Sequence, residues 1–275
     1  MSETNKAMSD TNTAIPGTLA ELLETMQRPG LLGVAGKAVQ KRCQKDLTSY
    51  FAALGKRISE MKFEDLADVN RGVSGEHARH AVGMRMHNLL RSRRPLLNAM
   101  LHANIVSAIA QANKTHVLAE ADGDDAPQKP GMTAEQAAAY AQLHAGELVT
   151  GLDATTLKTV ADAVAYGIEQ RLGVAGTAHL IKELVAGMST SRAETIATTE
   201  MADAMSQAFL KKLSNNDVEY KQWILGPDPC EVCIDNADAS PIPVDEDFPS
   251  GDDAPPAHPN CVCALAGARG PGGDF

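Results

Sequence analysis

Apolar residues recur every three or four positions along much of the chain, which is the spacing of one face of an α-helix. The repeat runs from about residue 19 to residue 116 and is clearest at Leu47, Phe51, Leu54 and Ile58. Pro95 falls within this part and is expected to start a new helix, because proline lacks an N–H group and disrupts a helix interior.

Helical spacing returns after residue 132. Thr133 and Gln136 have the spacing of a capping box, which predicts the start of a helix. The pattern continues over residues 153–172 and 177–185.

A further helix start is predicted at Ser191, where Glu194 completes the same motif. This helix is expected to end near Leu213, because Lys211 and Lys212 suit the negative end of the helix dipole.

The character of the chain changes after residue 216. The segment VEYKQWIL, which contains the sole tryptophan, Trp223, predicts a strand. Beyond it lie nine of the fourteen prolines and four of the five cysteines. Aromatic residues are only 4% of the chain against 44% hydrophobic residues, which argues against a β-sandwich or barrel. The predicted fold is mainly α, with a small C-terminal α+β module.

A stretch with three Asp, two Pro and two Gly, residues 119–132, is the best candidate for a linker. The predicted organisation is a disordered tail at 1–16, a basic helical domain at 17–118, this linker, a second domain at 133–266 whose Cys/His module spans 217–266, and a flexible tail at 267–275. The sequence contains no run of about 18 apolar residues, so no membrane span is predicted.

Charge is distributed unevenly. Residues 1–115 hold 16 Lys and Arg against 10 Asp and Glu, whereas residues 116–275 hold 9 against 25. Opposite signs suggest two parts that face different partners. The basic residues are a solvated helix face or a surface for DNA or an acidic partner. The candidate contacts are Arg85, Arg91, Arg93 and Arg94.

Five potential soft metal ligands fall within 34 residues near the C-terminus. They are Cys230, Cys233, His258, Cys261 and Cys263. A C-x-x-C pair followed by His-x-x-Cys can supply four tetrahedral ligands for Zn²⁺, although one ligand is then surplus. Disulfides and reduced, unligated cysteines are the alternatives. A structural zinc ion is the favoured interpretation, because a Pro-rich, acidic segment of about 50 residues has little apolar surface with which to fold alone.

The order of elements in the last eighty residues is distinctive. Arg192, a Thr-Glu pair ending at Glu200, Trp223 and Asp228 precede the C-x-x-C pair and the terminal His-Pro-x-Cys-x-Cys. This set resembles the C-terminal domain of the phage Mu F-like minor head proteins, also called phage head morphogenesis proteins, over roughly residues 140–266. Family members usually have an arginine where this chain has Thr198, and commonly another where it has Val262.

The resemblance implies a non-enzymatic, structural virion component that is located in the capsid interior or portal region, and in the host cytoplasm during assembly. The implied partners are the portal protein and other head proteins, and packaged DNA is a further candidate. No membrane or small-molecule partner is expected. The alternatives are a zinc-dependent enzyme acting on nucleic acid or protein, and a metal-stabilised DNA-binding adaptor.

Two further residue-level expectations concern helices. Arg192 and Glu200 lie eight positions apart, so both are expected on one helix face, holding that helix against the cysteine module through an ion pair. Cys43 stands apart from the other cysteines and is expected to be a buried small hydrophobe.

Overall fold

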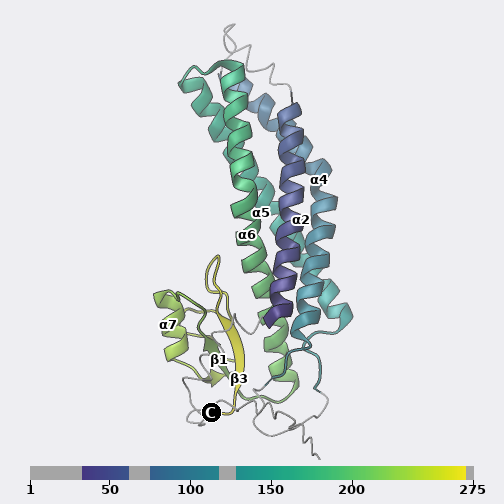
Figure 1. Cartoon of the computed structure of the whole chain (residues 1–275), viewed down its shortest axis with the longest axis vertical. Coiled ribbons are helices and arrows are strands. Elements are labelled where there is room, and N and C mark those ends of the chain that lie inside the picture. Colours follow the sequence, from purple (N-terminus) through teal and green to yellow (C-terminus); the bar gives the residue numbers. More distant parts are fainter. Residues whose placement is uncertain (1–32, 62–74, 118–127, 271–275) are drawn as a thin grey trace, which may run out of the picture.

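The structure is a computed structural model that describes residues 33–61, 75–117 and 128–270. Its main body is a bundle of four long helices, which we call the stalk (Figure 1). The four helices are α2 (Gly33–Glu60), α4 (Gly75–Ala112), α5 (Ala134–Glu169) and α6 (Gly173–Asn215). Successive helices run in opposite directions, with α2 beside α6 and α4 beside α5. The prediction of a mainly α fold is confirmed.

The predicted apolar repeat forms the core of the stalk. Leu47, Leu54 and Ile58 of α2 are all at most 1% exposed, and they pack with Leu, Ile, Met and Ala side chains of the other three helices. Cys43 is fully buried in this core, as predicted, and burial raises the pKa of its thiol to about 12. The core contains residues from both sides of the predicted linker.

The predicted helix boundaries are partly right. The capping box at Thr133 is present, because its hydroxyl accepts from the N–H of Gln136 at 3.2 Å while the Gln136 side chain accepts from the Thr133 N–H at 2.9 Å. The starts predicted at Pro95 and Ser191 are wrong, since α4 and α6 run through them without interruption. At Pro95 the buried side chains on either side keep the helix continuous despite the missing hydrogen bond.

The lower end of the stalk is held by side chains that bind backbone groups. Lys212, in the last turn of α6, is 3% exposed and its ammonium donates to the carbonyls of Asn113 and Thr115, just after α4. Asn113 in turn accepts from the N–H of Gly131 at 2.8 Å, and Asn215 donates to the carbonyl of Gly131 at 3.1 Å. The segment 128–132 is thereby fixed against α6.

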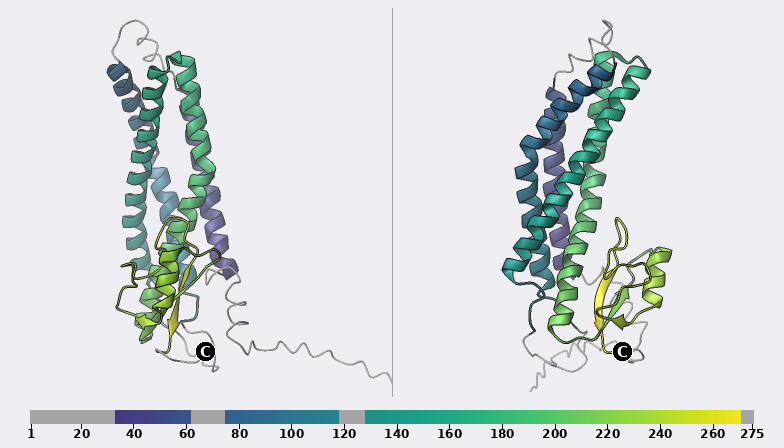
Figure 2. Two further views of the ribbon diagram at one scale, coloured as in Figure 1. Left: turned by 90° about the vertical axis from the view of Figure 1, so that its left-hand side faces the viewer. Right: turned by 180° about the vertical axis from the view of Figure 1, so that it is seen from behind.

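A small C-terminal module, residues 220–268, lies beside the lower part of α6 in every view (Figures 1 and 2). It contains β1 (Tyr220–Ile224), helix α7 (Glu231–Asp238), β2 (Ile242–Pro243) and β3 (Ala264–Ala268). The strands form an antiparallel sheet in the order β2-β1-β3. The strand predicted around Trp223 is confirmed as β1, whereas β2 and β3 were not predicted.

The module has a hydrophobic core of its own, and α6 contributes to it. Phe209 and Leu213, near the end of α6, pack with Trp223 of β1, with Leu265 of β3 and with Phe248, which follows β2. The rings of Trp223 and Phe248 meet edge to face at 5.0 Å. Helix α6 therefore belongs to both cores, and it connects the stalk to the module without a break.

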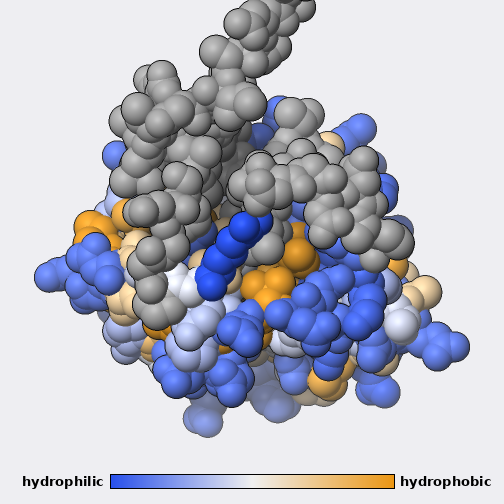
Figure 3. Space-filling model, turned by 90° about the horizontal axis from the view of Figure 1, so that it is seen from below, coloured by the Kyte–Doolittle hydropathy of each residue, from blue (hydrophilic) through white to orange (hydrophobic). Residues whose placement is uncertain are grey.

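The described surface at the lower end is largely hydrophilic, with a few hydrophobic positions between (Figure 3). None of the described helices is long and apolar enough to cross a membrane. The predicted tail at 1–16 lies outside the described residues, as do residues 119–127 of the predicted linker and 271–275 of the predicted C-terminal tail.

Candidate metal centre

The start of helix α7 positions the C-x-x-C pair. Cys230 is the N-cap residue of α7, and Cys233 lies in its first turn, where the N–H of Ile234 donates to the carbonyl of Cys230 at 3.0 Å. This turn directs both sulfurs to the same side. The adjacent helix N-terminus favours a negatively charged thiolate.

A tight turn positions the second pair. The N–H of Cys261 donates to the carbonyl of His258 at 3.1 Å, so the four residues from His258 to Cys261 form a β-turn. Pro259 followed by Asn260, whose φ is 62°, has the sequence and backbone that a type II turn requires. The turn places the His258 ring and the Cys261 sulfur on the side that faces α7.

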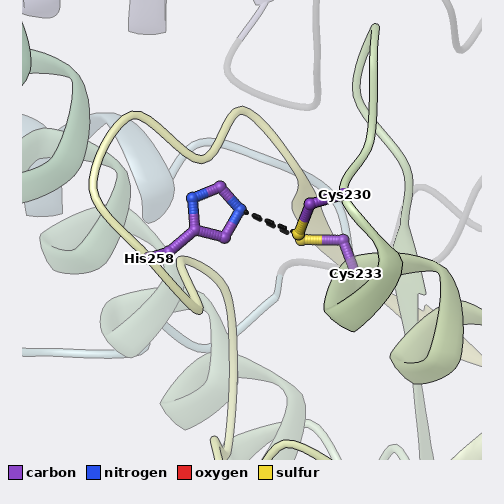
Figure 4. Close-up of side chains that lie close together, drawn as sticks. All are labelled: Cys230, Cys233 and His258. Atoms are coloured by element: carbon purple, nitrogen blue, oxygen red, sulfur yellow. Dashed lines mark hydrogen bonds between the residues drawn. The ribbon is translucent and has the colours of Figure 1, made fainter.

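The imidazole of His258 points at the C-x-x-C sulfurs (Figure 4). Its Nε2 lies 3.2 Å from Cys230 Sγ and 3.5 Å from Cys233 Sγ. Its Nδ1 is 3.0 Å from the carbonyl of Pro259. An Nδ1–H donated to that carbonyl leaves the Nε2 lone pair directed at the sulfurs, which is the arrangement that metal-ligating histidines use.

All five predicted ligands are brought together, in two overlapping groups. Cys230, Cys233 and His258 form one group, and Cys233, Cys261 and Cys263 form the other, with the ligand atoms of each group within 4.8 Å of one another. Cys233 Sγ is 3.7 Å from Cys261 Sγ. A tetrahedral ion with metal–sulfur bonds of about 2.3 Å needs sulfurs roughly 3.8 Å apart. The Cys/His group could therefore hold a metal ion.

Cys263 differs from the other sulfurs in its contacts. It is 4% exposed, and it accepts from the backbone N–H of Gly226 at 3.5 Å. A side-chain hydrogen bond from Cys261 lowers the pKa of Cys263 to about 5, while the pKa of Cys261 is raised. These donors favour the thiolate form of Cys263 over that of Cys261.

The C-x-x-C thiols differ in their readiness to ionise. The backbone N–H of Cys233 lowers the pKa of Cys230, whereas burial raises the pKa of Cys233 to about 12. A metal ion binds thiolates, so its binding would release the proton that burial keeps on Cys233.

The module also contains a buried lysine, which contacts the loop after β2. Lys221 of β1 is fully buried, donates to the carbonyl of Asp253 at 2.8 Å, and lies 5.2 Å from the centre of the Phe248 ring. Burial lowers the pKa of its ammonium.

Asp228, just before the C-x-x-C pair, is exposed and has a φ of 51°, a conformation that Asp tolerates better than most residues.

Arg192 and Glu200 do not hold α6 against the module, so that expectation is wrong. Arg192 donates to Thr156 Oγ1 at 3.1 Å and to the carbonyl of Leu152 at 3.0 Å, both on α5. Glu200 lies 2.8 Å from His144 Nε2, also on α5. Both side chains join helices of the stalk, because the face of α6 that bears them is directed at α5.

The four arginines proposed as nucleic-acid contacts have different environments. Arg85 and Arg91 are exposed on α4. Arg93 is partly buried, and Arg94 forms an ion pair with Asp153 Oδ2 at 2.5 Å. Asp153 is 3% exposed, so this pair stabilises the α4–α5 contact.

Two threonines that sequence reasoning missed contact the turn between the ligands. Thr195 and Thr199 of α6 accept hydrogen bonds from Asn260. Their spacing of four residues placed them on one helix face, but nothing in the sequence indicated which segment would lie opposite.

The fold and the site together define a helical-bundle protein that carries a small Cys/His module. Residues 158–266 match the family model described as Phage Mu protein F like protein. The match covers the C-terminal part of the chain and confirms the resemblance drawn from its motifs. The family suggests a phage head morphogenesis protein, a structural role and a location in the virion. No curated protein and no solved structure matches the chain.

Proposed function

We propose that this protein is a minor capsid protein of a tailed bacteriophage, with a structural, non-enzymatic role at the portal or on the inner capsid. One observation carries the proposal: the matched residues, 158–266, include all of α6, strands β1 and β2, the first part of β3 and every candidate metal ligand. The long stalk supports it, because a helix of 43 residues extends for about 65 Å and can span between two components of a shell.

The portal protein and other head proteins are the proposed partners. Mass spectrometry of purified virions and procapsids, made by the phage that encodes the chain, tests this directly. The protein should be present in both particles, and an affinity-tagged copy should purify together with portal protein. Its absence from virions and procapsids alike would contradict the proposal.

We further propose that the module holds a structural zinc ion through Cys230, Cys233, His258 and one sulfur from Cys261 or Cys263. The thiolate and imidazole donors and their spacings of 3.5 and 3.7 Å support this choice of metal. When bound, zinc contributes on the order of 10 kcal/mol to the free energy of folding of a module with a small core. Four protein ligands would leave no open position for a catalytic water.

Metal analysis of the purified protein tests the zinc proposal. The wild-type chain should contain one zinc ion, and Cys233→Ser should lose it, because Cys233 belongs to both ligand groups. Cys43→Ala is the matched control, since Cys43 lies in the stalk core and should not affect metal content. A wild-type protein that carries no metal, yet keeps residues 217–266 protected from hydrogen exchange in reducing buffer, would contradict a zinc site.

Contact with packaged DNA is a further part of the proposal. Arg85 and Arg91 are exposed on α4, and Lys37, Lys41 and Lys45 are exposed at four-residue spacing on α2. Binding through phosphates should weaken steeply as salt rises, and removing one such lysine should reduce the slope of log K against log salt by about one. Binding that does not weaken with salt would exclude this contact.

A further inference from the structure

Helix α6 of the stalk contacts the turn that carries two of the candidate ligands. The backbone N–H of Asn260 donates to Thr199 Oγ1 at 3.0 Å, and its side-chain amide donates to Thr195 Oγ1 at 3.2 Å. Asn260 lies between His258 and Cys261, whereas the threonines are one helical turn apart on α6. The two contacts therefore join the ligand turn to the stalk at two points.

The orientation of both ligands depends on this turn. The Cys261 N–H bonds the His258 carbonyl at 3.1 Å, and the Pro259 carbonyl lies 3.0 Å from His258 Nδ1. Asn260 has the positive φ that closes the turn. Fixing Asn260 on α6 therefore restricts the directions of the imidazole and of the Cys261 sulfur.

The contact lies well before the covalent connection between α6 and the module. The module is covalently joined to α6 beyond Asn215, and the shared core packs around Phe209 and Leu213. Thr199 is 16 residues before Asn215, or about 24 Å along the helix. Between these levels Gln207 of α6 donates to Asp253 Oδ1 at 3.0 Å, and Ala202 and Met205 line a small pocket with Cys263. The bonds to Asn260 add to these contacts, and they act on the ligand turn itself.

We infer that Thr195 and Thr199 are positioning residues of the metal site: through Asn260 they hold the His258–Cys261 turn in the conformation that binds the ion. Metal binding and docking of this turn on α6 then favour one another, because the coupling between two binding events is reciprocal. This inference rests on the proposed zinc site. It adds that a helix of the stalk, which supplies no ligand, sets the affinity of the module for its metal.

The test is zinc affinity, measured by competition with a chromogenic chelator, for the full chain and for Thr195→Ala/Thr199→Ala. The double variant should bind zinc on the order of tenfold more weakly, as is typical when partners that orient metal ligands are removed. Thr155→Ala/Thr159→Ala is the matched control, because these α5 threonines have the same spacing and bond only carbonyls of their own helix. The control should keep wild-type affinity.

Hydrogen exchange gives a second readout. Zinc should slow exchange in residues 258–263 of the wild-type protein, and this protection should shrink in the double variant. Asn260→Gly provides a milder change if the double variant folds poorly, since glycine keeps the positive φ and the backbone donor but loses the side-chain amide. It should weaken zinc binding by a smaller factor than the double variant.

The outcomes separate this inference from the proposal on which it rests. Wild-type affinity in both the double variant and Asn260→Gly would overturn the inference while leaving the zinc site in place. A wild-type protein that binds no zinc would overturn both. Equal weakening by the Thr155/Thr159 control would overturn the inference too, because the effect would then not depend on Asn260.

Discussion

Replacing Gly131 by alanine should destabilise the protein strongly. Gly131 is buried where the segment before α5 crosses α6. An added Cβ would lie 3.0 Å from the Ala208 carbonyl carbon and the Lys212 nitrogen, and closer still to the Ala208 carbonyl oxygen. All three are backbone atoms of α6, so no side chain can rotate away to make room.

The expected loss of stability follows from the movement of segment 128–132 that the added Cβ would require. The segment would have to shift by about an ångström or more to reach an ordinary contact distance of roughly 3.5 Å. Overpacking of this kind costs about 1–3 kcal/mol. The shift would also strain the bonds of Gly131 to Asn113 and Asn215, each worth about 0.5–1.5 kcal/mol. The free energy of unfolding should fall by about 2–5 kcal/mol, which lowers Tm by roughly 5–15 °C for a chain of this size.

Gly151→Ala is the matched control and should have the opposite sign. Gly151 lies inside α5, and an added Cβ there would have no neighbour within 4 Å. Alanine in an exposed helix interior should stabilise by about 0.5–1 kcal/mol. Thermal and urea unfolding followed by circular dichroism at one protein concentration gives both values. If Gly131→Ala unfolds at the wild-type midpoint while Gly151→Ala unfolds later, the segment 128–132 does not dock on α6 as described.

Two further predictions concern contacts between α5 and α6. The hydrogen bond to Glu200 raises the pKa of His144, and burial raises the pKa of Asp203 beside it. Both groups therefore bind protons more tightly in the folded state than in the unfolded state. The free energy of unfolding should therefore decrease as pH rises above 6.5 through the folded pKa of His144. In urea titrations at several pH values, His144→Gln should reduce this dependence of stability on pH. An unchanged dependence would refute the role assigned to His144. Arg192→Leu should lower the free energy of unfolding by about 1.5–3 kcal/mol, because it removes two charge-assisted hydrogen bonds to α5. The stability of Arg192→Lys should lie between that of the wild type and that of Arg192→Leu. Equal Tm values for the wild type and both variants would contradict the role assigned to this side chain.

Local patterns in the sequence predicted the parts of the fold that depend on neighbouring residues. The capping box at Thr133 and the apolar repeat around Leu47 are short-range signals, and both are confirmed. Local signals misled at Pro95 and Ser191, because tertiary packing continues a helix through a residue that would end or begin one in isolation. Strand β3 has the sequence ALAGA, which has no strand propensity; it forms because it pairs with β1 and packs on α6.

The candidate site shows the same division. The spacings C-x-x-C and His-x-x-Cys place the two ligands of each pair within one turn of chain. The two pairs lie 28 residues apart, and the ligand chemistry of all five residues predicted that they would meet. The partner of Asn260 could not be predicted, since 61 residues separate it from Thr199. The direction of Arg192 depends on which face of α6 packs on α5, and this is decided only when four helices assemble.

The continuity of α6 through both hydrophobic cores has a mechanical consequence. The same helix packs into the stalk core as far as Ala208 and into the module core at Phe209 and Leu213, so no loop separates the two cores along α6. A tilt of the module would therefore act directly on the stalk, and a small angle at one end of a helix of 43 residues becomes a displacement of many ångströms at the other.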